Sequence, residues 1–133
     1  MTQIKHKSTQ KQEAAQCLIN NGFYAESIHC SYYSCLLYMK YILHHISTKK
    51  NAVSYEKQEI KGASTHMHIL RLMKERINQP SKQKKVAKNF RYLKDMRNDA
   101  DYSAELFSAK ESYTVKKKAE SLKKILTNTF GNL

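Results

Sequence analysis

Arg97 stands at a position where a helical pattern predicts an apolar side chain. Apolar residues recur three or four positions apart at Val86, Phe90 and Leu93. The next residue on the same helix face is Arg97, and a buried charge without a partner is costly. Asp101 follows one helical turn later and offers a carboxylate. One interpretation is therefore an ion pair within the chain that closes the end of this helix.

A second interpretation of the same residues is a site for a phosphate. A guanidinium, an amide and a hydroxyl suit the oxygens of one phosphate, and Arg97, Asn98 and Tyr102 carry these groups. The residues that we assign to a phosphate- or nucleotide-binding site are Arg97, Asn98, Asp101, Tyr102 and His66. Of these, Arg97 and Tyr102 are also the candidate catalytic residues. The cysteines and histidines lack the spacing of a metal site, so we predict neither a metal nor a cofactor.

Amphipathic helices are predicted to position these residues. Residues 8–20 form a first helix that Asn21 and Gly22 end, because glycine tolerates the left-handed conformation found at helix ends. A second helix covers residues 24–46, and its apolar side chains occupy two adjacent faces, as is typical of a central helix. Residues 48–63 are polar and are predicted to form a long exposed loop.

Three further helices complete the predicted fold. Apolar stripes cover residues 66–77, 86–97 and 115–126, and Pro80 lies in the break between the first two. No segment alternates between apolar and polar residues with the period of a strand. We therefore predict an all-α fold, an antiparallel up-and-down bundle of four to five helices, in a single domain over residues 1–133.

The composition indicates a basic, cytoplasmic protein. The chain carries 24 Lys and Arg against 11 Asp and Glu, a formal net charge of +13. Such a charge suits nucleic acid, an anionic membrane surface or an acidic protein, and does not choose among them. Basic residues gather between positions 82 and 97, which favours non-specific attraction to RNA. The odd count of three cysteines favours a reducing compartment, and neither a signal peptide nor a membrane-spanning run is predicted.

Three short motifs, in this order, resemble the HEPN family (higher eukaryotes and prokaryotes nucleotide-binding domain). Residues 22–27 and 31–33, GFYAES and SYY, are similar to the family's G-x-Y-x-x-A…YYA helix. Residues 63–66, ASTH, are similar to the Thr/Ser-His pair that opens its third helix. Residues 93–102, LKDMRNDADY, resemble its LR-x-x-ADY signature. The resemblance covers most of the chain, roughly residues 14–102.

The resemblance implies a small up-and-down helical bundle and a function connected with RNA or nucleotides. Many members are similar to metal-independent ribonucleases with an Arg-x(4–6)-His motif, whose active site forms where two copies meet. Others look like partners of a small nucleotidyltransferase, often as the toxin of a toxin–antitoxin pair. By position, Arg97 matches the motif arginine and Asn98 the polar residue that often follows it.

The sequence departs from this pattern at Tyr102, which stands where the motif histidine belongs. With an ordinary pKa near 10, a tyrosine is ionised in only about one molecule in a thousand at pH 7. We therefore predict weak or absent nuclease activity. His29 and His66 lie on apolar stripes of other helices and are either substitutes for the missing histidine or hydrogen-bonded core residues. The tyrosines at positions 32, 33, 38 and 41 either stack bases or belong to the core.

The expected function is that of a HEPN-like protein that binds RNA or a nucleotide as a homodimer in the cytoplasm, away from membranes. The resemblance also implies a role as the toxin-like half of a toxin–antitoxin pair. The alternative is a non-catalytic module that docks on a small nucleotidyltransferase. In that alternative the pair of Arg97 and Asp101 only holds the helix together.

Overall fold

The computed structural model describes residues 2–50 and 65–131. These residues form five α-helices and no strand, which confirms the predicted all-α bundle. The helices are α1 (Thr2–Asn20), α2 (Tyr24–Lys50), α3 (Thr65–Glu75), α4 (Pro80–Tyr102) and α5 (Ala109–Phe130). None of the helices in this part of the chain is long and apolar enough to span a membrane.

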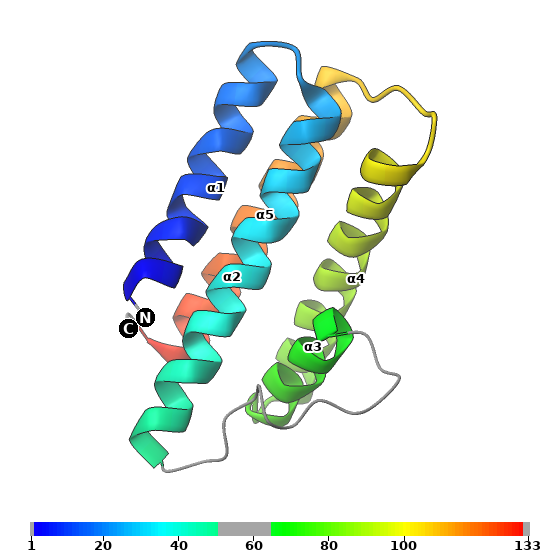
Figure 1. The fold of residues 1–133 in the computed structure, drawn as a ribbon. Coiled ribbons are helices and arrows are strands. Elements are labelled where there is room, and N and C mark those ends of the chain that lie inside the picture. Colours follow the sequence, from blue (N-terminus) through cyan, green and yellow to red (C-terminus); the bar gives the residue numbers. More distant parts are fainter. Residues whose placement is uncertain (1, 51–64, 132–133) are drawn as a thin grey trace.

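Four long helices run antiparallel in chain order, and the short α3 packs against the half of α4 where that helix begins (Figure 1). The central helix is α2, which contacts each of the other four. Its side chains at Ile28, Cys35, Met39 and Ile42 have no exposed surface. This burial on several sides confirms that the two apolar faces of α2 mark a central helix.

The turn between α1 and α2 confirms that Gly22 ends the first helix. Gly22 has a φ of +82°. The amide of Phe23 donates to the carbonyl of Leu18 at 2.8 Å, and the amide of Gly22 donates to that of Ile19 at 3.1 Å. This pair of hydrogen bonds is the Schellman arrangement, which needs a left-handed residue and therefore favours glycine.

The bounds of the first two helices differ from the prediction. The first helix begins at Thr2 instead of residue 8. Its early turns are held by contacts that apolar periodicity does not report, such as the hydrogen bond of 2.6 Å from Ser8 Oγ to the carbonyl of Ser34. The second helix continues to Lys50, so the first residues of the predicted loop are helical. The rest of that loop, residues 51–63, lies outside the described residues.

The later helices begin and end at local signals. Pro80 occupies the first turn of α4, where its missing amide hydrogen costs nothing. Ser108 caps α5 in a capping box with Glu111, which satisfies two backbone amides at the start of that helix. Together these signals set where α4 begins and where α5 returns along it, and so position the C-terminal half of α4, which carries Arg97.

Candidate functional site

Arg97 lies inside the bundle, as the apolar stripe predicts, and its side chain is only 10% exposed. Its guanidinium carbon lies 5.1 Å from the ring centre of Tyr32 and 5.6 Å from that of Tyr33. Its Nη1 is 3.6 Å from Oδ2 of Asp101, which confirms the expected ion pair one turn along α4. The Nε atom is buried and has no hydrogen-bond partner among the described residues. The guanidinium is thus held by ring faces and one carboxylate, with donor capacity left over.

Asp101 also contacts α2 through His29. The Nδ1 atom of His29 lies 2.9 Å from Oδ2 of Asp101 and 3.1 Å from Oδ1. An ionised carboxylate only accepts hydrogen bonds, so Nδ1 of His29 carries the hydrogen and donates it. In the neutral ring, Nε2 is then left as an acceptor, which is the arrangement of a histidine oriented by a carboxylate.

His66, at the start of α3, joins the cluster from a third helix. Its Nδ1 lies 2.7 Å from the hydroxyl oxygen of Tyr32. Burial, helped by the positive charges of Arg97, Lys40 and Lys94, lowers the pKa of His66 to about 4. Burial also raises the pKa of Tyr32, against the opposing effect of Arg97. At neutral pH the ring of His66 is therefore uncharged and Tyr32 keeps its proton.

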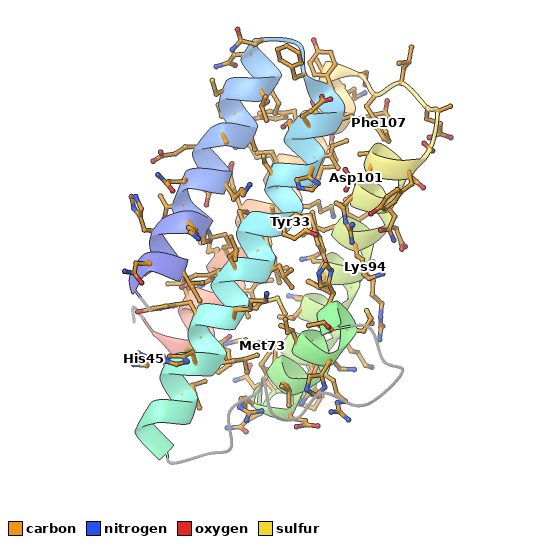
Figure 2. All side chains as sticks on the ribbon, viewed as in Figure 1. Tyr33, His45, Met73, Lys94, Asp101 and Phe107 are labelled. Atoms are coloured by element: carbon orange, nitrogen blue, oxygen red, sulfur yellow. The ribbon has the colours of Figure 1, made fainter. Side chains whose placement is uncertain are left out.

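We call the six residues brought together here the Arg97 cluster: His29, Tyr32, Tyr33, His66, Arg97 and Asp101. Figure 2 shows Tyr33, Asp101 and Lys94 along the face where α2 and α4 lie next to each other. Three of the five residues predicted from the sequence, Arg97, Asp101 and His66, belong to this cluster. Of the tyrosines for which the sequence left two alternatives, Tyr32, Tyr38 and Tyr41 are buried core residues and Tyr33 is half-buried against them. Tyr32 and Tyr33 also flank Arg97.

Tyr102 and Asn98 are not brought to the guanidinium of Arg97. The Tyr102 side chain is 79% exposed and makes no hydrogen bond with any described residue. Tyr102 is five residues from Arg97, so on a helix its side chain points about 140° away from that of Arg97. Asp101 is four residues from Arg97 and points only about 40° away. Asn98 is turned by about 100° and is half-buried, without a side-chain hydrogen bond in the described part of the chain.

A cavity of about 480 Å³ adjoins the cluster on the side of Tyr102. Its lining includes Glu26, His29, Cys30, Asp101 and Tyr102, from α2 and α4. Arg97 is not one of its lining residues, whereas Asp101 both lines the cavity and pairs with Arg97. The histidine that is oriented by Asp101 is therefore open to a ligand, while Arg97 is reached only through its small exposed surface.

Sequence reasoning gave His29 little weight, although a usable signal was present. His29, Tyr32 and Tyr33 are three and four positions apart, so one face of α2 presents all three side chains. The ring centres of His29 and Tyr33 are 4.6 Å apart, as that spacing allows. Which helix this face meets depends on packing, and packing supplies Arg97 and Asp101.

The described residues contain no group of three or more His, Cys, Asp or Glu side chains that is placed to hold a metal ion. Comparisons with protein-family models, curated proteins and solved structures give no match for this chain. The resemblance to the HEPN family stays a prediction that rests on the three motifs.

Proposed function

We propose that this protein binds a phosphate group of RNA or of a nucleotide at the Arg97 cluster, as its resemblance to the HEPN family implies. The observation that carries the proposal is the state of Arg97. Its guanidinium is nine-tenths buried, its Nε has no partner, and its nearest carboxylate oxygen lies at 3.6 Å, beyond hydrogen-bond distance. Such a group has donors to offer to an incoming phosphate oxygen.

The charges around the cluster support an anionic ligand. Arg97, Lys40 and Lys94 all act on the ring of His66, and Asp101 is the carboxylate paired with Arg97. The hydrogen bond from His29 further occupies the Asp101 oxygens. The local balance is positive, and a partly buried positive region attracts phosphate more strongly than an exposed one of equal charge.

A second candidate function, slow metal-independent cleavage of RNA, is favoured by the geometry of His29. Cleavage needs a base that takes the proton of the 2′-hydroxyl as its oxygen attacks phosphorus, and an acid that protonates the departing 5′-oxygen. Asp101 orients His29 so that Nε2 can accept the proton of the 2′-hydroxyl, and the same ring, once protonated, can give that proton to the departing 5′-oxygen. The ring of His66 is neutral at pH 7 because its pKa is lowered, so it does not supply this proton. The expectation of weak or absent activity was based on Tyr102, whereas His29 reaches Asp101 from another helix.

Binding of a labelled mononucleotide, such as fluorescent uridine monophosphate, tests the main proposal. We expect Arg97→Met to weaken binding at least tenfold and Tyr102→Phe, the matched control, to leave it within about twofold. Equal binding by the wild type and Arg97→Met would overturn the proposal. A stable complex with a small nucleotidyltransferase in gel filtration, with no mononucleotide binding, would support the alternative of a protein-docking module instead.

Cleavage is tested separately with a labelled single-stranded RNA in the presence of EDTA. Activity that is lost in both Arg97→Met and His29→Gln, while His29→Gln still binds the mononucleotide, would support the second candidate. Activity that is unchanged in both variants would identify a contaminating nuclease.

The two apolar faces of α2 do not support the proposed homodimer, because they are buried within the chain. The dimer is proposed from the family resemblance and from a set of exposed apolar side chains. The largest exposed apolar side chains, other than Tyr113, are Phe23, Tyr102 and Leu106. They belong to the α1–α2 turn, the end of α4 and the α4–α5 connection, which lie at one end of the bundle (Figure 1). We propose that a second copy packs on this end, and Leu106→Glu should then reduce the mass measured by light scattering to that of a monomer.

A further inference from the structure

A groove between α3 and α4 lies apart from the Arg97 cluster. It consists of two adjoining cavities of about 350 and 660 Å³. Lys74, Gln83 and Arg91 line both cavities, so the two form one depression. The side-chain amide of Gln83 is fixed where the two cavities meet, because its Nε2 donates to the carbonyls of Lys74 and Ile77 at 2.9 and 2.6 Å.

The rim of this groove is basic, and its cations are not paired with carboxylates among the described residues. Its cations are Arg71, Lys74, Lys84, Lys88 and Arg91, against the carboxylates of Glu75 and Asp95. Among the described residues none of these five cations forms an ion pair, whereas Glu75 pairs with Arg76, outside the groove. Unpaired cations that share a concave surface repel one another, and a bound polyanion removes that repulsion.

The floor of the groove is less polar than its rim. Met67, Leu70 and Ala87 contribute to it, and Leu70 is only 1% exposed. The half-buried ring of Tyr92 lies at the α4 side. An apolar floor between rows of cations suits a single strand, whose bases and sugars meet the floor while its phosphates meet the rim.

A ridge of cations connects the groove with the Arg97 cluster. Lys88, Arg91, Lys94 and Arg97 follow one another at steps of three residues, which makes one oblique row on the helix surface. Nine residues of helix measure about 14 Å along the axis and turn by about 180°, so the row winds from the exposed Lys88 half-way around α4 to the buried Arg97. At about 3.4 Å per stacked nucleotide, the axial length alone corresponds to about four nucleotides, so a strand that follows the row holds at least that many.

We propose that the α3–α4 groove binds a single-stranded segment of nucleic acid, at least about four nucleotides long, whose end follows the row of cations around α4 to Arg97. This inference rests on the proposed function, because the row of cations leads to the phosphate site suggested there. An acidic protein segment would meet the same charges, but it gives no reason for the row to continue to Arg97. RNA and DNA share the phosphate chemistry, and the experiment separates them.

The test compares the affinities of uridine monophosphate and of labelled oligouridylates of about two, four and eight nucleotides, by fluorescence anisotropy. We expect affinity to rise steeply up to at least about four nucleotides, the length that spans the row along the axis of α4. The variant Lys88→Gln with Arg91→Gln should weaken tetranucleotide binding at least tenfold and reduce the salt slope by about 1.4, while mononucleotide binding stays unchanged. The matched control is Lys110→Gln with Lys124→Gln, two exposed lysines of α5 that do not line the groove.

The outcomes separate this inference from the proposed function. Equal losses in the groove variant and in the α5 control would overturn the groove, since net charge alone would then explain them. Mononucleotide binding that needs Arg97, without dependence on oligonucleotide length, would also overturn the groove and leave the proposed function standing. Length-dependent binding that needs Lys88 and Arg91, without mononucleotide binding, would support the groove and overturn the site at Arg97.

Two competitors complete the test. Displacement of the tetranucleotide by polyglutamate at equal charge concentration would overturn the assignment to nucleic acid and favour an acidic protein partner. A deoxyribonucleotide strand of the same length should bind as well as the ribonucleotide strand if phosphates and bases alone are recognised. A large preference for RNA would also support the groove and would place a 2′-hydroxyl contact in it.

Discussion

The carboxylate of Asp101 on α4 accepts a hydrogen bond of 2.9 Å from Nδ1 of His29 on α2, although 72 residues separate the two in sequence. The same carboxylate lies 3.6 Å from Nη1 of Arg97. One side chain therefore joins a histidine that faces a cavity to an arginine that is nearly sealed from solvent. This relationship gives Asp101 a role that the motif comparison does not contain: it orients His29 and competes with a ligand for Arg97.

Replacing Asp101 by asparagine tests that competition. Asp101→Asn keeps an oxygen that can accept from His29, but it removes the negative charge next to Arg97. We expect the affinity for uridine monophosphate to rise about threefold to tenfold, because a repulsion between two negative charges is lost. Titration calorimetry at fixed salt measures the change. Asp99→Asn, on an exposed face of α4, is the control, and a lower affinity for Asp101→Asn would contradict this role of the carboxylate.

The stability of Arg97 variants separates packing from charge. Arg97→Met retains a long apolar side chain between Tyr32 and Tyr33, so we expect the free energy of unfolding to change by less than about 2 kcal/mol. Arg97→Ala leaves a cavity as well and should cost about 2–4 kcal/mol. Urea unfolding followed by circular dichroism measures both. A severe loss in Arg97→Met would show that the ion pair with Asp101 is needed for folding.

His66 should make stability depend on pH. The unfolded chain binds a proton at this residue near pH 6.5, whereas the folded chain binds it only near the lowered pKa of about 4. The unfolded state therefore holds more protons between these values, and the stability is complete above pH 6.5 and falls as pH drops toward 4. For a half-buried ring, the loss should be about 1–2 kcal/mol after solvent screening.

Comparison of His66→Gln with the wild type isolates this effect, since glutamine can still accept a hydrogen bond from Tyr32. The wild type should lose more stability than the variant over the same pH range in thermal unfolding. His6→Gln, at an exposed position of α1, should follow the wild type. Parallel curves for the wild type and His66→Gln would mean that the ring is not desolvated as described.

The three cysteines should react in the order of their burial. Cys17 is exposed, Cys30 is half-buried, and Cys35 has no exposed surface. Burial raises the pKa of Cys35 to about 12, against the opposing charge of Lys123, and burial also raises the pKa of Cys30. Since the thiolate is the reacting form, iodoacetamide should modify Cys17 first, Cys30 more slowly and Cys35 only after unfolding.

Peptide mass spectrometry after timed labelling reports the order. Addition of urea provides the control, because all three thiols should then react at similar rates. Rapid native modification of Cys35 would show that the contact between α2 and α5, where its Sγ donates to the carbonyl of Ala119 at 3.3 Å, opens readily.

The features that depend on local geometry could be predicted from the sequence. Apolar periodicity is a property of one helix, so the later helices and the central position of α2 followed from it. The end of α1 at Gly22 and the break at Pro80 depend on the φ preferences of single residues. The pairing of Arg97 with Asp101 follows from helical spacing alone, and the same spacing already turns Tyr102 away from them.

Contacts between helices were decided by the tertiary structure. Periodicity marks which face of α2 is buried, but not which helix packs against that face. The hydrogen bond from His29 to Asp101 could therefore not be predicted from the sequence. The bond from Tyr32 to His66 spans 34 residues, and residues 51–64 between α2 and α3 show no pattern that sets how the two helices meet. The sequence by itself determined the helices and identified Arg97 as the central residue of the candidate site. Only packing decided its neighbours, because those distances depend on how whole helices fit together.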